Sequence, residues 1–103
     1  MKPHIRIYFD SFRIDPTEVV LCEMCASVAV DIHHINARGS GGDPQKKKDR
    51  IENLQAVCRE CHQSLGDQKI FKHALFTTHK KVMQQADVTF CENWIDKQIE
   101  RYK

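Results

Sequence analysis

Long apolar runs are missing from this sequence. No stretch approaches the ~20 residues that a membrane-spanning helix needs, and the first residues lack the apolar core of a signal peptide. A strong excess of either charge is missing as well, because 16 Lys and Arg residues stand against 14 Asp and Glu residues. Bulk charge therefore does not identify a nucleic-acid partner. We expect a soluble, cytoplasmic protein that has no membrane partner.

The sequence is also short and undivided. Its 103 residues contain no linker and no repeat beyond a paired Cys-x-x-Cys, so we expect one domain over residues 1–103. A domain of this size buries little surface, and a cross-link that stabilises the fold is expected. Five cysteines are available to provide it.

The order of predicted elements mixes strands with helices, which is typical of an α+β fold. Stretches rich in β-branched and aromatic residues predict three strands: 5–14 (one strand or a bent hairpin), 28–35 and 54–57. The polar segment 36–50 holds glycines and a proline and is predicted to be a loop.

The second half of the chain is predicted to be helical. Apolar spacing indicates helices at 63–69, at 70–86 with a break at Thr77-Thr78, and at 88–102. Thr89 and Glu92 could form a capping box for the last helix, and Cys91, on its apolar stripe, is expected to be a small core residue.

Four of the cysteines form two Cys-x-x-Cys pairs, Cys22/Cys25 and Cys58/Cys61. In a chain without a secretory signal this pattern favours a metal over disulfides. Four thiolates form a closed tetrahedral site, so the expected occupant is a structural Zn²⁺ whose binding stabilises the fold. The alternative is two unrelated pairs of buried or redox-active thiols.

Three histidines lie next to these pairs in the sequence. His33 and His34 stand between the two pairs, and His62 directly follows the second. Because one ion would clamp both pairs together, we expect the three imidazoles to meet and to share a second metal that keeps positions open for water and substrate. The remaining histidines are expected to be structural: His4, His73 and His79.

The combined motif resembles the HNH endonucleases. Its order is Cys-x-x-Cys, then Asp-x-His-His-Ile, a Gly-rich loop, Glu-Asn-Leu and finally Cys-x-x-Cys-His, over residues 22–62. The closest resemblance is to the subgroup whose ββα-metal motif is supported by a four-cysteine zinc. The resemblance implies a small α+β domain, in which 1–21 adds an N-terminal strand or hairpin and 63–103 adds helices. It implies a metal-dependent DNA endonuclease.

The resemblance also assigns roles to single residues. His34 matches the general base, and His33 and His62 match the ligands of a catalytic divalent ion. Asn53 matches the asparagine that braces the loop and orients the base. Asp31, on the same side of the strand as His33, is expected to support a metal ligand by hydrogen bonding. Strict alternation would put His33 and His34 on opposite faces, so their joint use requires the strand to end or bend there.

The ligand set has a consequence for the catalytic metal. Two imidazoles are softer ligands than Mg²⁺ prefers, so we expect higher activity with Mn²⁺, Ni²⁺ or Co²⁺ than with Mg²⁺. Excess Zn²⁺ is expected to inhibit.

The expected partner is DNA, in double-stranded form. Basic side chains that could contact its backbone are Arg38, Lys46, Lys47, Lys48, Arg50 and Arg59. The sequence leaves open a nicking enzyme, a homodimer that cuts both strands, and a phage-type accessory to DNA packaging. The alternative function is a non-catalytic zinc-ribbon module that binds nucleic acid or protein.

Overall fold

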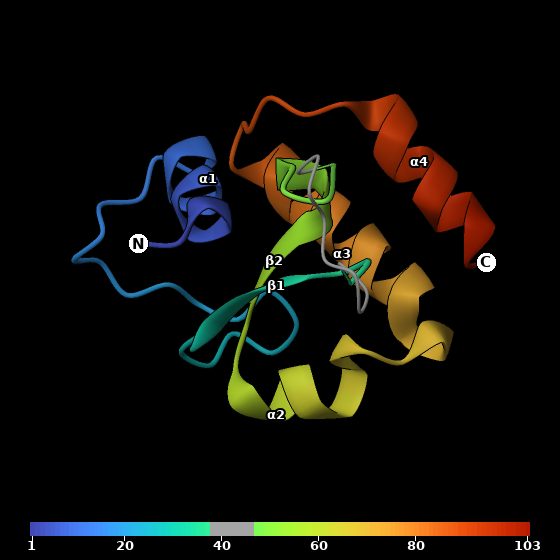
Figure 1. Cartoon of the computed structure of the whole chain (residues 1–103), viewed down its shortest axis with the longest axis horizontal. Helices are drawn as coiled ribbons and strands as arrows, with labels where there is room; N and C mark the ends of the chain where they lie inside the picture. Colours follow the sequence, from blue (N-terminus) through green and yellow to red (C-terminus); the bar gives the residue numbers. More distant parts are fainter. Residues whose placement is uncertain (38–46) are drawn as a thin grey trace.

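The computed structural model describes residues 1–37 and 47–103, and it has the expected α+β architecture (Figure 1). Its elements are α1 (Pro3–Ser11), β1 (Asp31–His34), η1 (Ile51–Asn53), β2 (Leu54–Val57), α2 (Arg59–Cys61), η2 (His62–Gly66), η3 (Lys69–Phe71), α3 (Lys72–Gln85) and α4 (Glu92–Arg101). The two strands pair antiparallel, with His33 opposite Gln55 and His34 opposite Leu54. Strand β2 has the bounds predicted for the strand at 54–57, whereas β1 is shorter than the strand predicted at 28–35.

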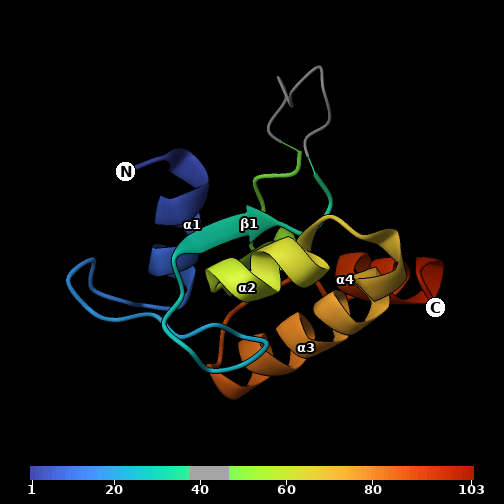
Figure 2. The same cartoon turned by 90° about the horizontal axis from the view of Figure 1, so that it is seen from below.

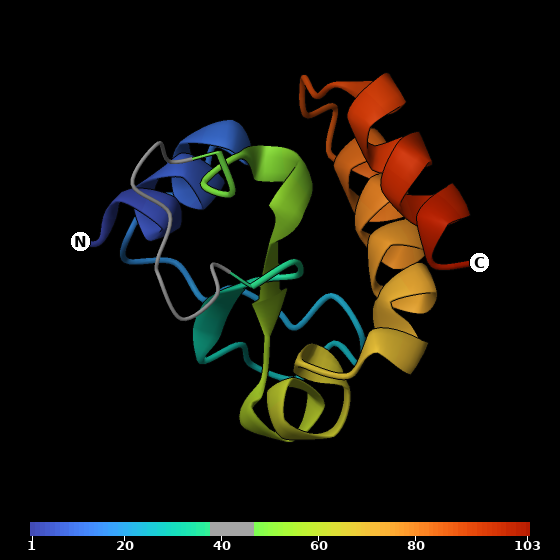
Figure 3. The same cartoon turned by 45° about the vertical axis from the view of Figure 1, so that its right-hand side comes forward.

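The hairpin is the centre of the molecule. Helix α1 lies on one side of it, and α3 and α4, which pack side by side, lie on the other (Figure 3). α2 and η2 cover the lower end of the hairpin in Figure 1 and face the viewer in Figure 2. One hydrophobic core joins these layers, and its fully buried members include Ile35, Leu54, Leu75, Phe76, Met83 and Ile95. Among the described residues, no helix is both apolar enough and long enough to cross a membrane.

The N-terminal segment corrects the sequence analysis. The strand or hairpin predicted at 5–14 is wrong, because Pro3–Ser11 forms helix α1 with Pro3 in its first turn. Proline fits that position, where its missing N–H is not needed. The two residues of the helix that are buried, His4 and Tyr8, are four apart and share one face. Packing of this face on the hairpin outweighs the preference of the β-branched and aromatic residues for strands.

The break predicted at Thr77-Thr78 is also wrong. Helix α3 runs without interruption from Lys72 to Gln85. The hydroxyl of Thr77 donates to the carbonyl of His73, at 2.7 Å, so this polar side chain is satisfied inside the helix. The short helix predicted at 63–69 is instead the π-helical turn η2, which ends at Gly66.

Helix α4 begins later than predicted. It starts at Glu92, and its N-cap residue, Cys91, is exposed and makes no side-chain cap, so both the capping box and a core position for Cys91 are wrong. The backbone N–H of Cys91 donates instead to Glu52 Oε2, at 2.7 Å. A buried carboxylate from η1 therefore caps α4, and a contact between distant segments replaces the local one.

Candidate active site

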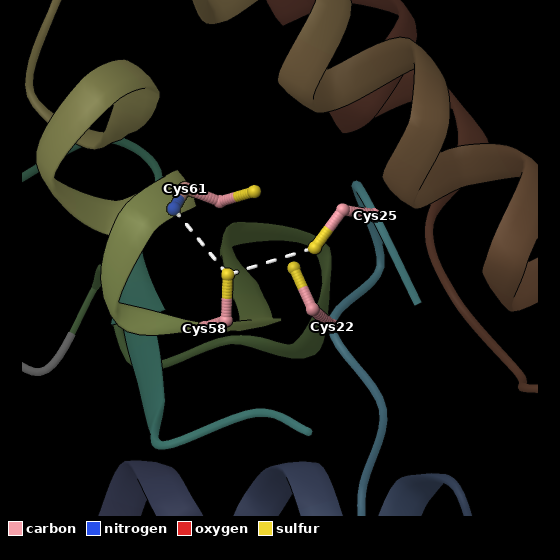
Figure 4. Close-up of side chains that lie close together, drawn as sticks. All are labelled: Cys22, Cys25, Cys58 and Cys61. Carbon is pink, nitrogen blue, oxygen red and sulfur yellow. Dashed lines mark hydrogen bonds between the residues drawn. The ribbon is translucent and has the colours of Figure 1, made fainter. Parts of the chain in front are cut away.

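The four paired cysteines form one cluster (Figure 4). Their sulfur atoms all lie within 4.8 Å of one another, and Cys25 Sγ is 3.6 Å from Cys58 Sγ. Sulfurs about 2.3 Å from a tetrahedral zinc would be about 3.8 Å apart, so the cluster can hold such an ion. Hydrogen bonds from the Ser27 side chain and amide lower the pKa of the exposed Cys25 thiol to about 6, whereas burial and contact with the other cysteines raise the pKa of Cys61. The thiols therefore share their protons, and a bound metal would displace them.

The three histidines of the motif line a single open cavity of about 670 Å³. His33 and His34 reach it from the last two positions of β1, and His62 reaches it from the first position of η2. β1 ends at His34, as the joint use of the two neighbouring histidines requires, and both residues line the cavity. The sequence analysis predicted that the strand carrying His33 would lie close to the segment carrying His62, and the structure shows this proximity.

His33 and His62 lie side by side in this cavity. Their ring centroids are 5.3 Å apart, and Asp31 Oδ2 lies 3.8 Å from His62 Nδ1. A methyl group at Gly66 would lie 3.6 Å from both His33 Nδ1 and His62 Nε2. These two nitrogens therefore approach the same small space, while the opposite nitrogen of His62 faces the carboxylate.

His33 has the properties of a metal ligand. Its side chain is buried, and its Nδ1 is the buried nitrogen for which the described residues offer no hydrogen-bond partner. Burial lowers the pKa of His33, so the ring stays neutral, as ligation requires. The residues present thus fit a divalent ion with two nitrogen ligands. Within the described parts of the chain, the cysteine cluster is the only group of three or more ligand side chains that meet so closely.

His34 has two neighbours that the sequence analysis did not assign to the site. Its Nε2 lies 2.6 Å from Asp49 Oδ1, and the Asp49 side chain is almost fully buried, with 3% exposed. The ring of His4, from α1, lies 4.7 Å from the ring of His34 and lines the same cavity. In the sequence, Asp49 only interrupts a basic run and His4 is an isolated histidine, so neither carried a signal that linked it to His34.

Asn53 connects two described segments, through hydrogen bonds to Asn36 and to Lys48. Its Oδ1 accepts the backbone N–H of Asn36 at 2.8 Å, and its Nδ2 donates to the carbonyls of Asn36 and Lys48 at 3.1 and 3.0 Å. The side chain is fully buried. This geometry is that of a loop brace, and the part of Asn53 in orienting the base stays a prediction.

The basic residues predicted to contact DNA have different surroundings. Arg38 and Lys46 lie outside the described residues, and Lys47 and Arg59 are exposed. Lys48 Nζ donates to the carbonyl of Ala37 at 2.6 Å. Arg50 donates to Glu52 Oε1 at 2.7 Å and stacks over Trp94 at 4.6 Å, so it makes structural contacts to η1 and α4.

Two lysines that the sequence analysis did not assign to the site line the cavity itself. Lys2 comes from the start of α1 and Lys72 from the start of α3. Lys72 Nζ donates to the carbonyl of Ile35 at 2.6 Å, and partial burial lowers the pKa of its ammonium group. Both lysines lie beyond the motif, so only the fold brings them to the site.

The fold is a small α+β module in which a four-thiol cluster that could hold a metal ion lies beside a hairpin that carries histidines. Residues 22–68 match the family model described as HNH endonuclease. The match contains both cysteine pairs and the three histidines of the motif, and it confirms the resemblance. Helices α1, α3 and α4 lie outside it. No curated protein and no solved structure matches the chain.

Proposed function

We propose that the protein is a metal-dependent DNA endonuclease that hydrolyses phosphodiester bonds in double-stranded DNA. The observation that carries this proposal is that His33 Nδ1 and His62 Nε2 approach the same space beside Gly66, while both residues line one cavity with His34. A structural zinc module needs only the four thiols. It has no need for a second, open site lined by imidazoles.

His33 and His62 would hold one divalent ion. When bound, the ion supplies positive charge that stabilises the phosphate and the departing 3′-oxygen. Asp31 Oδ2 lies 3.8 Å from His62 Nδ1, and its negative charge there would favour the tautomer that has the proton on Nδ1 and the lone pair on Nε2. The few protein ligands leave room for water and a phosphate oxygen at the same site.

His34 would act as the general base. The Asp49 carboxylate accepts a hydrogen bond, so the proton of the neutral ring lies on Nε2 and the lone pair on Nδ1. This nitrogen takes a proton from the water that attacks phosphorus. The products implied by the family are a 5′-phosphate and a 3′-hydroxyl end.

Lysines around the cavity would hold the DNA backbone. Lys2 and Lys72 line the cavity. Lys47 and Arg59 do not line it, but both are exposed, and Arg59 precedes His62 by three residues. Contacts of this kind position a duplex without reading its sequence. Binding is therefore expected to weaken steeply as the salt concentration rises.

The test is cleavage of supercoiled plasmid with a panel of divalent metals. Wild-type protein is expected to nick or linearise the plasmid, and His34→Ala to lose about 100-fold or more of this activity while it keeps its zinc and its DNA binding. His73→Ala is the matched control, because His73 Nδ1 contacts the Ile99 carbonyl and does not line the cavity.

The alternative is a non-catalytic zinc module. The four-cysteine cluster by itself fits this function equally well. It predicts that wild-type protein binds DNA or protein but cleaves no plasmid with any metal, and that His34→Ala changes nothing measurable. That result would reject the nuclease.

A further inference from the structure

A buried polar network lies directly behind His33. Gln55, on β2, is fully buried, and its Oε1 is 3.2 Å from His33 Nε2. Its Nε2 donates to the carbonyl of Leu75 and to Glu23 Oε1, each at 3.2 Å. The network therefore joins the hairpin, helix α3 and the Cys22–Cys25 turn, which carries Glu23.

The partners of Gln55 leave its amide only one orientation. A backbone carbonyl and a carboxylate both accept hydrogen bonds, so the NH₂ group of Gln55 must face Leu75 and Glu23. The amide oxygen then has to face His33. Because this oxygen can only accept, His33 Nε2 must carry the ring proton, and the lone pair of the neutral ring is on Nδ1.

Glu23 is itself held in place from several sides. Tyr8 donates its hydroxyl proton to Glu23 Oε2 at 2.6 Å, and His79 Nδ1 lies 2.8 Å from Oε1. Burial, together with the nearby Glu23 carboxylate, raises the pKa of Tyr8, so its phenol stays protonated and acts as the donor. The backbone N–H of Glu23 donates to the carbonyl of Ala56 at 3.0 Å, which fixes the turn to β2.

We propose that Gln55, oriented by Glu23, is a positioning residue that holds His33 in the tautomer whose Nδ1 lone pair faces His62. The inference rests on the metal site of the proposed function. Glu23 stands between two zinc-cluster cysteines, so the same turn that contributes two of the thiols also sets the ligand nitrogen of the second site. Holding a histidine ligand through its other nitrogen typically raises metal affinity by about 10- to 100-fold.

The tautomer can be read without any activity measurement. In zinc-loaded protein labelled with ¹⁵N-histidine and free of other metals, long-range ¹H–¹⁵N NMR identifies the nitrogen that carries the proton. Wild-type His33 is expected to show the proton on Nε2, in slow exchange with water. A proton on Nδ1, or a rapidly exchanging one on Nε2, would overturn the proposal, whatever the variants do.

Two substitutions test the part played by Gln55. Gln55→Leu removes the acceptor and is expected to let the Nδ1–H tautomer appear, whereas Gln55→Glu keeps an acceptor toward His33 and is expected to retain the wild-type tautomer. If the Leu variant keeps only Nε2–H, Gln55 does not select the tautomer. His62→Ala is expected to leave the tautomer of His33 unchanged.

Metal affinity gives an independent measurement. Mn²⁺ competes poorly with Zn²⁺ for the four thiolates. The decrease of the free Mn²⁺ signal in EPR therefore measures the number of ions bound at the second site. Gln55→Leu is expected to weaken Mn²⁺ binding about 10- to 100-fold. The exposed Gln84→Leu on α3 is the matched control and should bind Mn²⁺ as wild type does. Equal affinity in both variants would contradict the proposal.

The two proposals fail in different ways. Metal-dependent cleavage by a wild-type protein whose His33 carries its proton on Nδ1 would reject the positioning role alone. Absence of second-site Mn²⁺ binding in a protein that has the Nε2–H tautomer would reject the nuclease proposal and support only the assigned tautomer.

Discussion

Gly66 lies so close to His62 that a methyl group at position 66 would come within 2.7 Å of His62 Cδ2. A side-chain Cβ atom essentially never comes this close to another heavy atom, so a side chain at this position would force the imidazole to shift. Because residue 66 is a glycine, the imidazole of His62 can pack directly on the backbone of η2. In this position His62 Nε2 lies next to the space that His33 Nδ1 also approaches.

Gly66→Ala is expected to lower Mn²⁺ affinity about 10-fold or more, because the His62 ring must turn away from His33. Mn²⁺ binding followed by EPR measures the change. Ser64→Ala, at an exposed position of the same turn, should bind Mn²⁺ normally. Wild-type affinity in Gly66→Ala would show that His62 is not held as described.

Asp49→Asn is expected to lower the cleavage rate about 100-fold while plasmid binding is retained. An asparagine can turn its NH₂ group toward His34 Nε2, which would move the ring proton to Nδ1 and remove the lone pair from the base. Single-turnover cleavage and DNA binding are measured separately. Asp96→Asn, whose carboxylate pairs with Lys80 away from the cavity, is the control. A variant with the wild-type rate would remove Asp49 from the mechanism.

Cys58→Ser is expected to lose bound zinc and to unfold at a much lower temperature, because zinc binding supplies folding free energy in small domains. Zinc content and thermal denaturation by circular dichroism measure both effects. Cys91→Ser is the matched control, since Cys91 is exposed and outside the cluster. A stable Cys58→Ser protein that retains zinc would contradict the assignment of the four-thiol site.

The parts of the fold that the sequence predicted are those fixed by local pattern. Leu54–Val57 forms the predicted strand because all four side chains are buried and it is bounded by the polar Asn53 and by Cys58. The cysteine cluster follows from ligand spacing alone. The segment 5–14 could not be assigned in this way, because its helix depends on packing against the hairpin.

The supporting residues of the site could not be predicted for a related reason. Glu23, Asp49 and His4 reach His33 and His34 only through contacts between segments that are distant in the sequence. Among 14 acidic residues, no pattern singles out the two that are buried beside a histidine. The motif identifies the groups expected to perform the chemistry, whereas the groups that orient them depend on the tertiary fold.

Acid is expected to weaken the attachment of α4 through Glu52. Burial alone would raise the pKa of this carboxyl, but hydrogen bonds from Arg50 and from the Cys91 amide outweigh it and hold the pKa below its usual 4.5. A carboxyl whose pKa is lower in the folded state stabilises the fold above its unfolded pKa, and this contribution is lost as the pH falls through the folded value.

Comparison of wild type with Glu52→Gln isolates this effect, because the loss of zinc in acid affects both proteins. At pH 7 the wild type is expected to be more stable by about 1.5–3 kcal/mol, the range for hydrogen bonds to a charged group. Below pH 4.5 the difference should shrink progressively. Denaturant unfolding at a series of pH values measures it, and a difference that stays constant into acid would contradict the role of the charge.

The metal dependence of cleavage tests the ligand set itself. Two imidazole nitrogens bind borderline metals better than Mg²⁺, which prefers oxygen ligands and keeps much of its water. Plasmid cleavage is therefore expected to be faster with Mn²⁺, Co²⁺ or Ni²⁺ than with Mg²⁺, and excess Zn²⁺ should inhibit by occupying the second site. His62→Asp replaces one imidazole with a carboxylate, so it should shift the preference toward Mg²⁺ if His62 is a ligand. Cleavage with Mg²⁺ that equals or exceeds that with all three other metals would show that oxygen atoms, and not His33 and His62, dominate the binding of the catalytic ion.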